Sequence, residues 1–236
     1  MKTVVHKAQS RGFADHGWLK AAHSFSFASY YDPTRIHFGK LRVLNDDIIE
    51  AGTGFGTHPH DNMEIVTIPL QGKIAHKDSK GHSQVCGPNE VQVMSAGTGI
   101  QHSEYNDSST EALNLLQLWI FPDADGHEPR YDQMSFAPTE KIDKWQLLVS
   151  PQKGPDALWL HQDAWLSISE MRAGLTLPYN IHSKTNGVYA FVIDGDVKIA
   201  GENLQRRDAL GIWECEKFDT QAVTDAHVVL IEIPMR

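Results

Sequence analysis

The sequence predicts an all-β protein made of two small barrels in tandem. Apolar residues occur in short bursts of strand length, with little sign of a sustained helical period. Gly, Pro, Asn and Asp separate these bursts, and one strand–turn–strand pattern recurs after about half the chain. With 236 residues, the chain is long enough to bury a core in each barrel without disulfides.

The expected strands begin near Lys40, and turn residues bound each of them. The segment before them, through Pro33, is rich in aromatic residues and Ser but has no clear period, so no element is predicted there. The expected strands include Arg42–Leu44, Glu64–Leu70, Glu90–Met94, Leu113–Phe121, Trp145–Val149, Val188–Ile193 and His227–Ile233.

Two similar segments suggest that one barrel was duplicated. Val66–Ile74 and Tyr189–Val197 each contain a strand, a tight Gly turn and a return strand, as in a hairpin. Gly72 and Gly195 occupy the same place in the two segments, 123 residues apart. Residues 122–138 are rich in Pro, Asp and Gly, which indicates a connector. We therefore expect an N-terminal domain over residues 1–130 and a C-terminal domain over residues 131–236.

The charge excludes some partners. Acidic residues outnumber basic ones by 30 to 21, and the formal net charge is -9, so neither direct nucleic-acid binding nor attraction to an anionic membrane is expected. No basic start with an apolar run appears in Met1–Ser10, and no stretch is long enough to span a membrane. A cytoplasmic location is the expectation.

The two cysteines do not indicate a disulfide framework or a thiolate metal site. Cys86 and Cys215 lie far apart and match no C-x-x-C pattern. Nothing near them in the sequence indicates a depressed thiol pKa. We expect both to be buried, structural free thiols.

The chemistry of the chain is expected at two pairs of residues with the same spacing. His58 and His60 lie two positions apart at the start of a strand-like run, and His102 and Glu104 repeat this spacing after a Gly-rich turn. Side chains two apart on a strand point to the same face, so neighbouring strands would bring three imidazoles and one carboxylate together. Such ligands suit iron, nickel, copper, manganese or zinc, and the lack of thiolate argues against a closed structural zinc site. Glu64 also has even spacing from His58 and stays a geometric alternative for the carboxylate.

Several motifs together resemble the pirin family of bicupins, over essentially the whole chain. They are His16-Gly17-Trp18, His23-Ser24-Phe25-Ser26-Phe27, Tyr30-Tyr31-Asp32-Pro33, Thr57-His58-Pro59-His60, Met94-Ser95-Ala96-Gly97-Thr98-Gly99 and His102-Ser103-Glu104-Tyr105.

The resemblance implies two tandem cupin barrels of the jelly-roll type. It also implies one divalent transition metal per chain, iron first, with nickel, cobalt, copper, manganese or zinc as the other candidates. The metal ligands carried over are His58, His60, His102 and Glu104. Glu64 then becomes a structural residue or a partner of the ligands.

The second half keeps less of this pattern. Pro178–Ser183 contains a single histidine, His182, and Leu210–Cys215 has no H-x-E counterpart. One imidazole cannot hold a catalytic metal, and the second domain of the family is typically degenerate. We therefore expect the C-terminal barrel to be metal-free.

Other conspicuous side chains have structural explanations. Histidines outside the two pairs are more often surface residues or satisfied core residues than ligands, and aromatic residues more often pack between sheets than line a substrate wall. These expectations concern His16, His23, His37, His161, Trp18, Phe25, Phe27, Tyr30 and Tyr31.

The family resemblance also implies a function. Some bacterial pirins resemble quercetin 2,3-dioxygenases, so the leading hypothesis is a metal-dependent dioxygenase that cleaves a flavonol such as quercetin with O2 and releases carbon monoxide. Glu104 would be both ligand and general base for the 3-hydroxyl proton. The alternative is a non-enzymatic metal-binding regulator that acts through protein partners, as eukaryotic pirins do. A third hypothesis is that flavonol cleavage is a side activity of the metal site, and that the physiological substrate is another small molecule.

Overall fold

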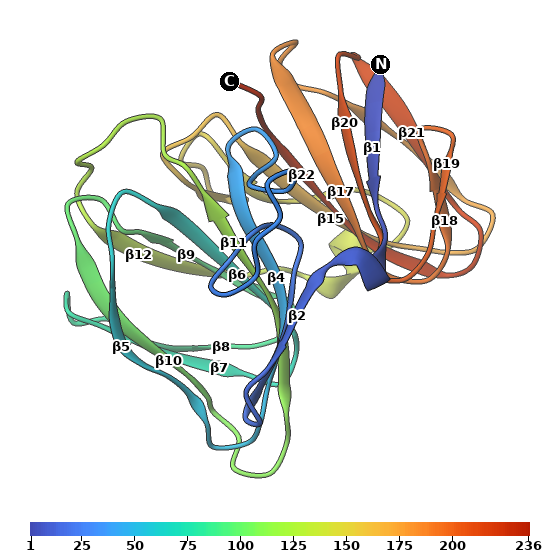
Figure 1. Ribbon diagram of the computed structural model, residues 1–236. Helices are drawn as coiled ribbons and strands as arrows, with labels where there is room; N and C mark the ends of the chain where they lie inside the picture. The colour runs from blue at the N-terminus through green and yellow to red at the C-terminus, as the bar shows by residue number, and fades with distance from the viewer.

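The computed structural model describes all 236 residues, which form strands in two seven-stranded and two four-stranded sheets (Figure 1). Pairing is antiparallel throughout, apart from one short parallel pair between β13 and β14. The only regular helical segments are two 3-10 turns, η1 (Ala8–Ser10) and η2 (Pro138–Lys141). Neither has the length or the apolar character of a membrane-crossing helix. The expected all-β class is confirmed.

One large and one small sheet face each other in the N-terminal half. The large sheet has the order β12 (Arg130–Ser135), β9 (Glu90–Ser95), β6 (Glu64–Gln71), β11 (Leu113–Ile120), β4 (Leu41–Ile49), β3 (Leu19–His23) and β2 (Gly12–Asp15). The small sheet has the order β5 (Gly54–His60), β10 (Ile100–Asn106), β7 (Ile74–Asp78) and β8 (Ser83–Cys86).

The C-terminal half repeats this plan. Its large sheet has the order β1 (Lys2–His6), β20 (Ala209–Trp213), β17 (Asn186–Asp194), β22 (Ala226–Pro234), β15 (Trp165–Met171), β13 (Gln146–Ser150) and β14 (Leu158–Trp159). Its small sheet has the order β16 (Thr176–Asn180), β21 (Lys217–Ala222), β18 (Val197–Ile199) and β19 (Glu202–Leu204).

Sheet membership departs from the expected division at residue 130 in two places. The first strand, β1, pairs along its whole length with β20, so it belongs to the sheets of the C-terminal half (Figure 1). β12 lies inside the stretch expected to be a connector, yet it pairs with β9 as an edge strand of the N-terminal large sheet. An edge strand needs only one apolar face and one partner, which explains why its polar sequence gave no strand signal.

The two Gly turns are also not hairpins. Gly72 follows β6 and Gly195 follows β17, and in both cases the chain passes from a large sheet to the small sheet that faces it. Both glycines have φ near +80°, and a Cβ atom on either would press against backbone at the start of the neighbouring strand. The shared turn therefore marks the same corner of each barrel.

The two large sheets pack back to back. The largest apolar cluster contains 26 buried residues from both halves, including Leu116 and Leu118 of β11 and Phe191 of β17. Alternation along β11 then turns Gln117 and Trp119 toward the interior of the N-terminal barrel. Cys86 is buried and its pKa is raised by burial to about 12, while Cys215 is half-buried, and both thiols are free.

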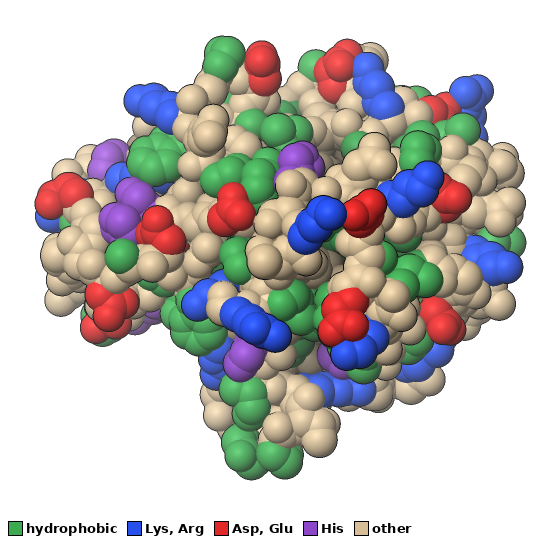
Figure 2. All heavy atoms as spheres, turned by 90° about the horizontal axis from the view of Figure 1, so that it is seen from above, with side chains coloured by type: hydrophobic (Ala, Val, Ile, Leu, Met, Phe, Trp, Pro, Cys, Tyr) green, Lys and Arg blue, Asp and Glu red, His purple; other side chains and the backbone are tan.

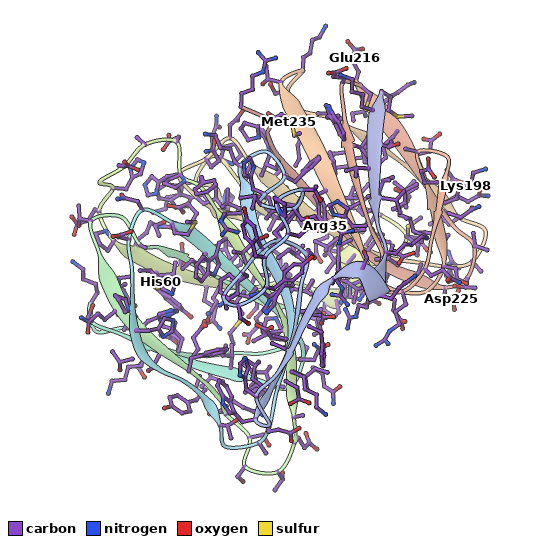
Figure 3. All side chains as sticks on the ribbon, in the orientation of Figure 1. Arg35, His60, Lys198, Glu216, Asp225 and Met235 are labelled. Atoms are coloured by element: carbon purple, nitrogen blue, oxygen red, sulfur yellow. The ribbon has the colours of Figure 1, made fainter.

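The surface shows no continuous basic face in the view from above. Acidic and basic side chains are interspersed there, with small apolar areas between them (Figure 2). Figure 3 shows His60 within the N-terminal barrel, and Lys198 and Asp225 at the outside of the C-terminal barrel.

Candidate metal centre

β5 and β10 bring three of the predicted histidines together. The two strands are antiparallel neighbours, with His58 opposite His102 and His60 opposite Ile100. The ring centroids of His58 and His102 lie 4.4 Å apart, and those of His60 and His102 lie 4.8 Å apart. One nitrogen of each ring falls within 4.8 Å of the others. The spacing of two along each strand thus brings these three rings together.

The three rings are prepared to bind a cation. The Nδ1 atom of His58 lies 2.8 Å from the carbonyl oxygen of Gly56, so Nδ1 carries the proton and Nε2 keeps its lone pair. The Nε2 atom of His102 is buried without any hydrogen-bond partner. A buried nitrogen that faces two other imidazoles and has no partner fits a metal ligand.

Burial keeps the imidazoles of His60 and His102 neutral. Burial, together with a smaller contribution from the neighbouring imidazoles, lowers the pKa of His60 to about 4 and that of His102 to about 2. Neutral imidazole is the form that coordinates metals. A divalent ion therefore does not have to displace protons from these two side chains near neutral pH.

Glu104 lies on the same strand as His102, deeper in the barrel. It is buried, and its two carboxylate oxygens accept hydrogen bonds from Gln92 (2.8 Å) and Gln117 (2.9 Å). Thr67 joins the two amides, because its hydroxyl accepts from Gln92 and donates to Gln117. Burial raises the pKa of Glu104 to about 7, against the opposing effect of these hydrogen bonds. Its carboxylate groups with His102 and His76 rather than with the other two histidines.

Glu64, the alternative carboxylate, has other partners. It is buried near the start of β6, where Ser95 donates to it at 2.7 Å and the Nδ1 atom of His161 lies 3.2 Å away. It is absent from both groups of potential metal ligands. Glu64 therefore links β6 and β9 to the C-terminal half, which contributes His161, and His161 is a satisfied histidine as expected.

An interior cavity of about 200 Å³ adjoins the histidines. Phe27, Phe55 and Trp119 line it together with Glu104. On the other side of the histidines lies an open groove of about 930 Å³. His58, His60 and Trp119 line both spaces, so they separate the groove from the interior.

The interior cavity contains one carboxyl group that the sequence did not single out. Asp47 of β4 lines the cavity and is 5% exposed, and its Oδ1 atom has no hydrogen-bond partner. Burial raises its pKa to about 8, and the nearby carboxylates of Asp46 and Glu104 contribute. Such a group stays neutral near pH 7. Only the pairing of β4 with β11, which puts Asp47 on the cavity side of the large sheet, would have revealed it.

The aromatic residues near the N-terminus have different surroundings. Phe25 lies in the core between the large sheets, as expected. Trp18, also as expected, packs against a cluster of seven buried apolar residues inside the N-terminal barrel. The expectation is wrong for Tyr31, which is 74% exposed, and Phe27 lines the interior cavity. Of the other histidines, His23 is buried and bonded to Asn45, whereas His16 and His37 are exposed.

Comparison with known proteins agrees with this architecture. The family model described as Pirin matches residues 4–120, and the model described as Quercetinase C-terminal cupin domain matches residues 147–233. A protein of Escherichia coli K12 named quercetin 2,3-dioxygenase is 44% identical over 98% of both chains. The chain belongs to the pirin family. The expected bicupin fold is therefore confirmed.

Other pirins are similarly close. A pirin-like protein of Caulobacter vibrioides is 40% identical, with 94% of this chain and 95% of the relative covered. Among solved structures, the bacterial pirin YhhW of Escherichia coli in complex with nickel(II) is 43% identical and matches with a TM-score of 0.94 over the whole of both chains.

His182 lies in the region of the C-terminal barrel that corresponds to His58 and His60, but its environment is different. The Nδ1 atom of His182 lies 2.8 Å from the carboxylate of Glu232, and its ring stacks on Trp165. Glu232 also accepts hydrogen bonds from Tyr179 and Asn186. This imidazole serves as one of several donors to a buried carboxylate.

Proposed function

We propose that this pirin is a metal-dependent dioxygenase that cleaves a flavonol such as quercetin with O2 and releases carbon monoxide. The observation that carries the proposal is the buried, unpartnered Nε2 atom of His102, which faces two further imidazoles beside an aromatic-lined cavity. The name of the Escherichia coli relative, quercetin 2,3-dioxygenase, supports the choice of substrate.

Four side chains would hold one divalent transition metal in this proposal: His58, His60, His102 and Glu104. Imidazole and carboxylate together suit iron, nickel, cobalt, copper, manganese and zinc. The nickel(II) complex of the pirin YhhW supports a divalent ion as the cofactor. When bound, the metal supplies a Lewis acid and a template for the flavonol oxygen. We propose in addition that the C-terminal domain holds no metal.

Glu104 is the proposed general base. A carboxyl group whose pKa is raised by burial to about 7 accepts a proton readily near neutral pH and can also return it. Gln92 and Gln117 hold the carboxylate oxygens in place, so the proton acceptor is fixed before the substrate arrives. The proton it takes is that of the flavonol 3-hydroxyl group.

The cavity supplies the site for a flat aromatic substrate. Phe27, Phe55 and Trp119 offer ring faces and edges to a planar ligand, and their apolar surfaces keep water away from it. Trp119 packs edge-on against both Phe27 and His60, with centroid distances of 5.2 and 4.8 Å. These contacts hold the indole between the ligand space and the histidines.

The decisive experiment follows the flavonol absorption band in air. Protein reconstituted separately with iron, nickel, cobalt, copper, manganese or zinc is mixed with quercetin, and carbon monoxide is assayed in the headspace. We expect O2-dependent loss of the band with at least one metal and none with His58→Ala, because one of three imidazole ligands is missing. His16→Ala is the matched control, since His16 is exposed and outside the site.

Two outcomes contradict this proposal. Full turnover by His58→Ala would remove the metal assignment. No loss of the band with any metal would favour the regulator, whose test is capture of a protein partner that depends on the bound metal. A catalytic efficiency on quercetin far below ~10⁴ M⁻¹s⁻¹ would instead make flavonol cleavage a side activity.

A further inference from the structure

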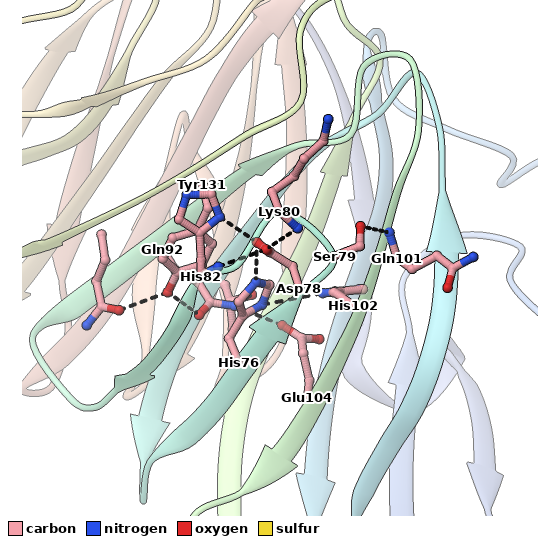
Figure 4. A network of polar contacts seen from close by, with 12 residues as sticks. His76, Asp78, Ser79, Lys80, His82, Gln92, Gln101, His102, Glu104 and Tyr131 are labelled. Atoms are coloured by element: carbon pink, nitrogen blue, oxygen red, sulfur yellow. Dashed lines mark hydrogen bonds and ion pairs between the residues drawn. The ribbon is translucent and has the colours of Figure 1, made fainter.

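A row of polar side chains continues from His102 toward the surface, away from the other two histidines. β7 flanks β10 on the side opposite β5, and it places His76 beside Glu104 and Asp78 beside His102 (Figure 4). The Nδ1 atoms of His76 and His102 lie 3.4 Å apart, and the Nε2 atom of His76 lies 3.2 Å from Oδ2 of Asp78. The ring of Tyr131 stacks on His76 at 4.4 Å and limits its rotation.

Asp78 forms the fixed end of this row. Its Oδ1 atom accepts hydrogen bonds from the backbone N–H groups of Lys80 (2.9 Å) and His82 (3.1 Å). Its Oδ2 atom lies 2.8 Å from the Nδ1 atom of His82. Burial alone would raise the pKa of Asp78, but the hydrogen bonds from His76, His82 and the backbone outweigh it and lower the pKa. The group is therefore a carboxylate, which only accepts.

The proton positions along the row follow in order. Because Oδ2 of Asp78 accepts, the Nε2 atom of His76 carries a proton, and a neutral imidazole then leaves Nδ1 bare. A bare Nδ1 on His76 requires that the Nδ1 atom of His102 donates. His102 is then left with a lone pair on Nε2, the buried nitrogen that has no partner in the protein.

We infer that Asp78 and His76 are positioning residues that fix the tautomer of His102 and keep its Nε2 lone pair directed at the metal. Metal-bound histidines normally donate their other ring N–H to such a partner, which orients the ring. Here the partner is a second histidine, which relays the preference of a carboxylate. The inference rests on the proposed metal centre, but it does not depend on flavonol cleavage.

Asp78→Asn should reverse the direction of the hydrogen bonds along this row. The two backbone donors keep the amide oxygen at the Oδ1 position, so the amide nitrogen occupies the Oδ2 position and can only donate. His76 must then accept at Nε2 and carry its proton on Nδ1. His102 accepts in turn at Nδ1 and carries its proton on Nε2, where the metal should bind.

The experiment measures nickel(II) affinity by competition with a chromophoric chelator. We expect Asp78→Asn to bind nickel(II) about 10–100-fold more weakly than the wild type, in line with other partners of metal ligands. His76→Phe keeps the stacking on Tyr131 but removes both ring nitrogens. This variant should lose less nickel(II) affinity, because it leaves His102 free to adopt either tautomer and does not impose the wrong one. His82→Gln is the matched control: it removes another neighbour of Oδ2, on a side chain that is 39% exposed, and should leave nickel affinity close to wild type.

A second measurement needs no metal. The ¹⁵N chemical shifts of the histidine rings in metal-free protein report which nitrogen carries the proton. We expect His102 to be protonated at Nδ1 in the wild type and at Nε2 in Asp78→Asn. An Nε2 proton in the wild type, or an unchanged tautomer together with unchanged nickel affinity in Asp78→Asn, overturns the inference. Failure of the wild type to bind nickel(II) at all would count against the metal centre instead, and the ring shifts would still test the tautomer.

Discussion

The two barrels share one plan but differ in what fills them. The C-terminal barrel contains a continuous cluster of 15 buried apolar residues. The N-terminal barrel has only two small clusters, of seven and four residues, because buried polar side chains occupy the space between them. Chief among these are Glu104, Gln92 and His102. In the first barrel, the polar residues of the candidate metal centre thus replace part of the apolar core.

This exchange is tolerated because the barrels do not fold around separate cores alone. The 26-residue cluster between the large sheets is the largest in the molecule, and both halves contribute to it. β1 adds a further connection, since the first strand of the chain completes the large sheet of the second half. Burial of apolar area in these regions offsets the polar interior of the first barrel.

The largest expected difference between the two barrels is in metal binding. His102→Ala should lose at least ~100-fold in nickel(II) affinity, because it removes a ligand whose outer partners alone are worth about 10–100-fold. His182→Ala changes the histidine that the second barrel keeps in the region corresponding to His58 and His60. This variant should retain the metal content of the wild type, because His182 lies against the Glu232 carboxylate and stacks on Trp165. Metal per chain after dialysis, measured by mass spectrometry, checks both. Metal loss from His182→Ala would place a site in the second barrel.

The free energy of unfolding, in contrast, should depend strongly on the apolar interior of the C-terminal barrel. Leu210→Ala in the apolar interior of the C-terminal barrel should lower the free energy of unfolding by about 2–5 kcal/mol, since it removes buried methyl groups and leaves a cavity. Urea unfolding of metal-free protein measures this loss. Metal affinity should be unchanged wherever the variant is folded. A cost well under 1 kcal/mol would mean that the second barrel is loosely packed and that the contrast between the barrels is false.

The sequence predicted the convergence of the three histidines better than the partners within the site. Strand alternation was enough to bring His58, His60 and His102 together, because it needs only that their two strands be neighbours. It could not separate Glu104 from Glu64, since both have even spacing. Their surroundings differ only through which strands pair and which face of each strand turns inward.

The residues missed were those whose role depends on register. His76 and Asp78 also lie two positions apart on a strand, as the ligands do, but they matter because β7 pairs with β10 at one particular register. The place of β1 in the second half was likewise hidden, because its partner lies about 200 residues away, and local sequence does not encode such pairing. The same holds for Asp47, an ordinary carboxyl group until the barrel closes over it.

The last prediction concerns that buried carboxyl group and sharpens the comparison further. The folded protein keeps Asp47 protonated up to a pKa of about 8, whereas in the unfolded chain the group releases its proton near pH ~3.9. Between these values the native state binds one more proton than the unfolded state. Stability therefore falls as pH rises from about 4 to about 8, by at most ~1.4 kcal/mol per pH unit from this group.

Asp47→Asn removes this dependence, because the amide is neutral in both states. The variant should gain stability relative to the wild type as pH rises from 5 to 8, measured by urea unfolding of metal-free protein at each pH. Asp219→Asn, which changes an exposed carboxyl group of the second barrel, should show no such growing difference. Parallel pH profiles for Asp47→Asn and the wild type would mean that Asp47 is ionised in the native state. The polar interior of the first barrel would then contain a second charged carboxylate beside Glu104, and the cavity would favour cationic ligands over neutral ones.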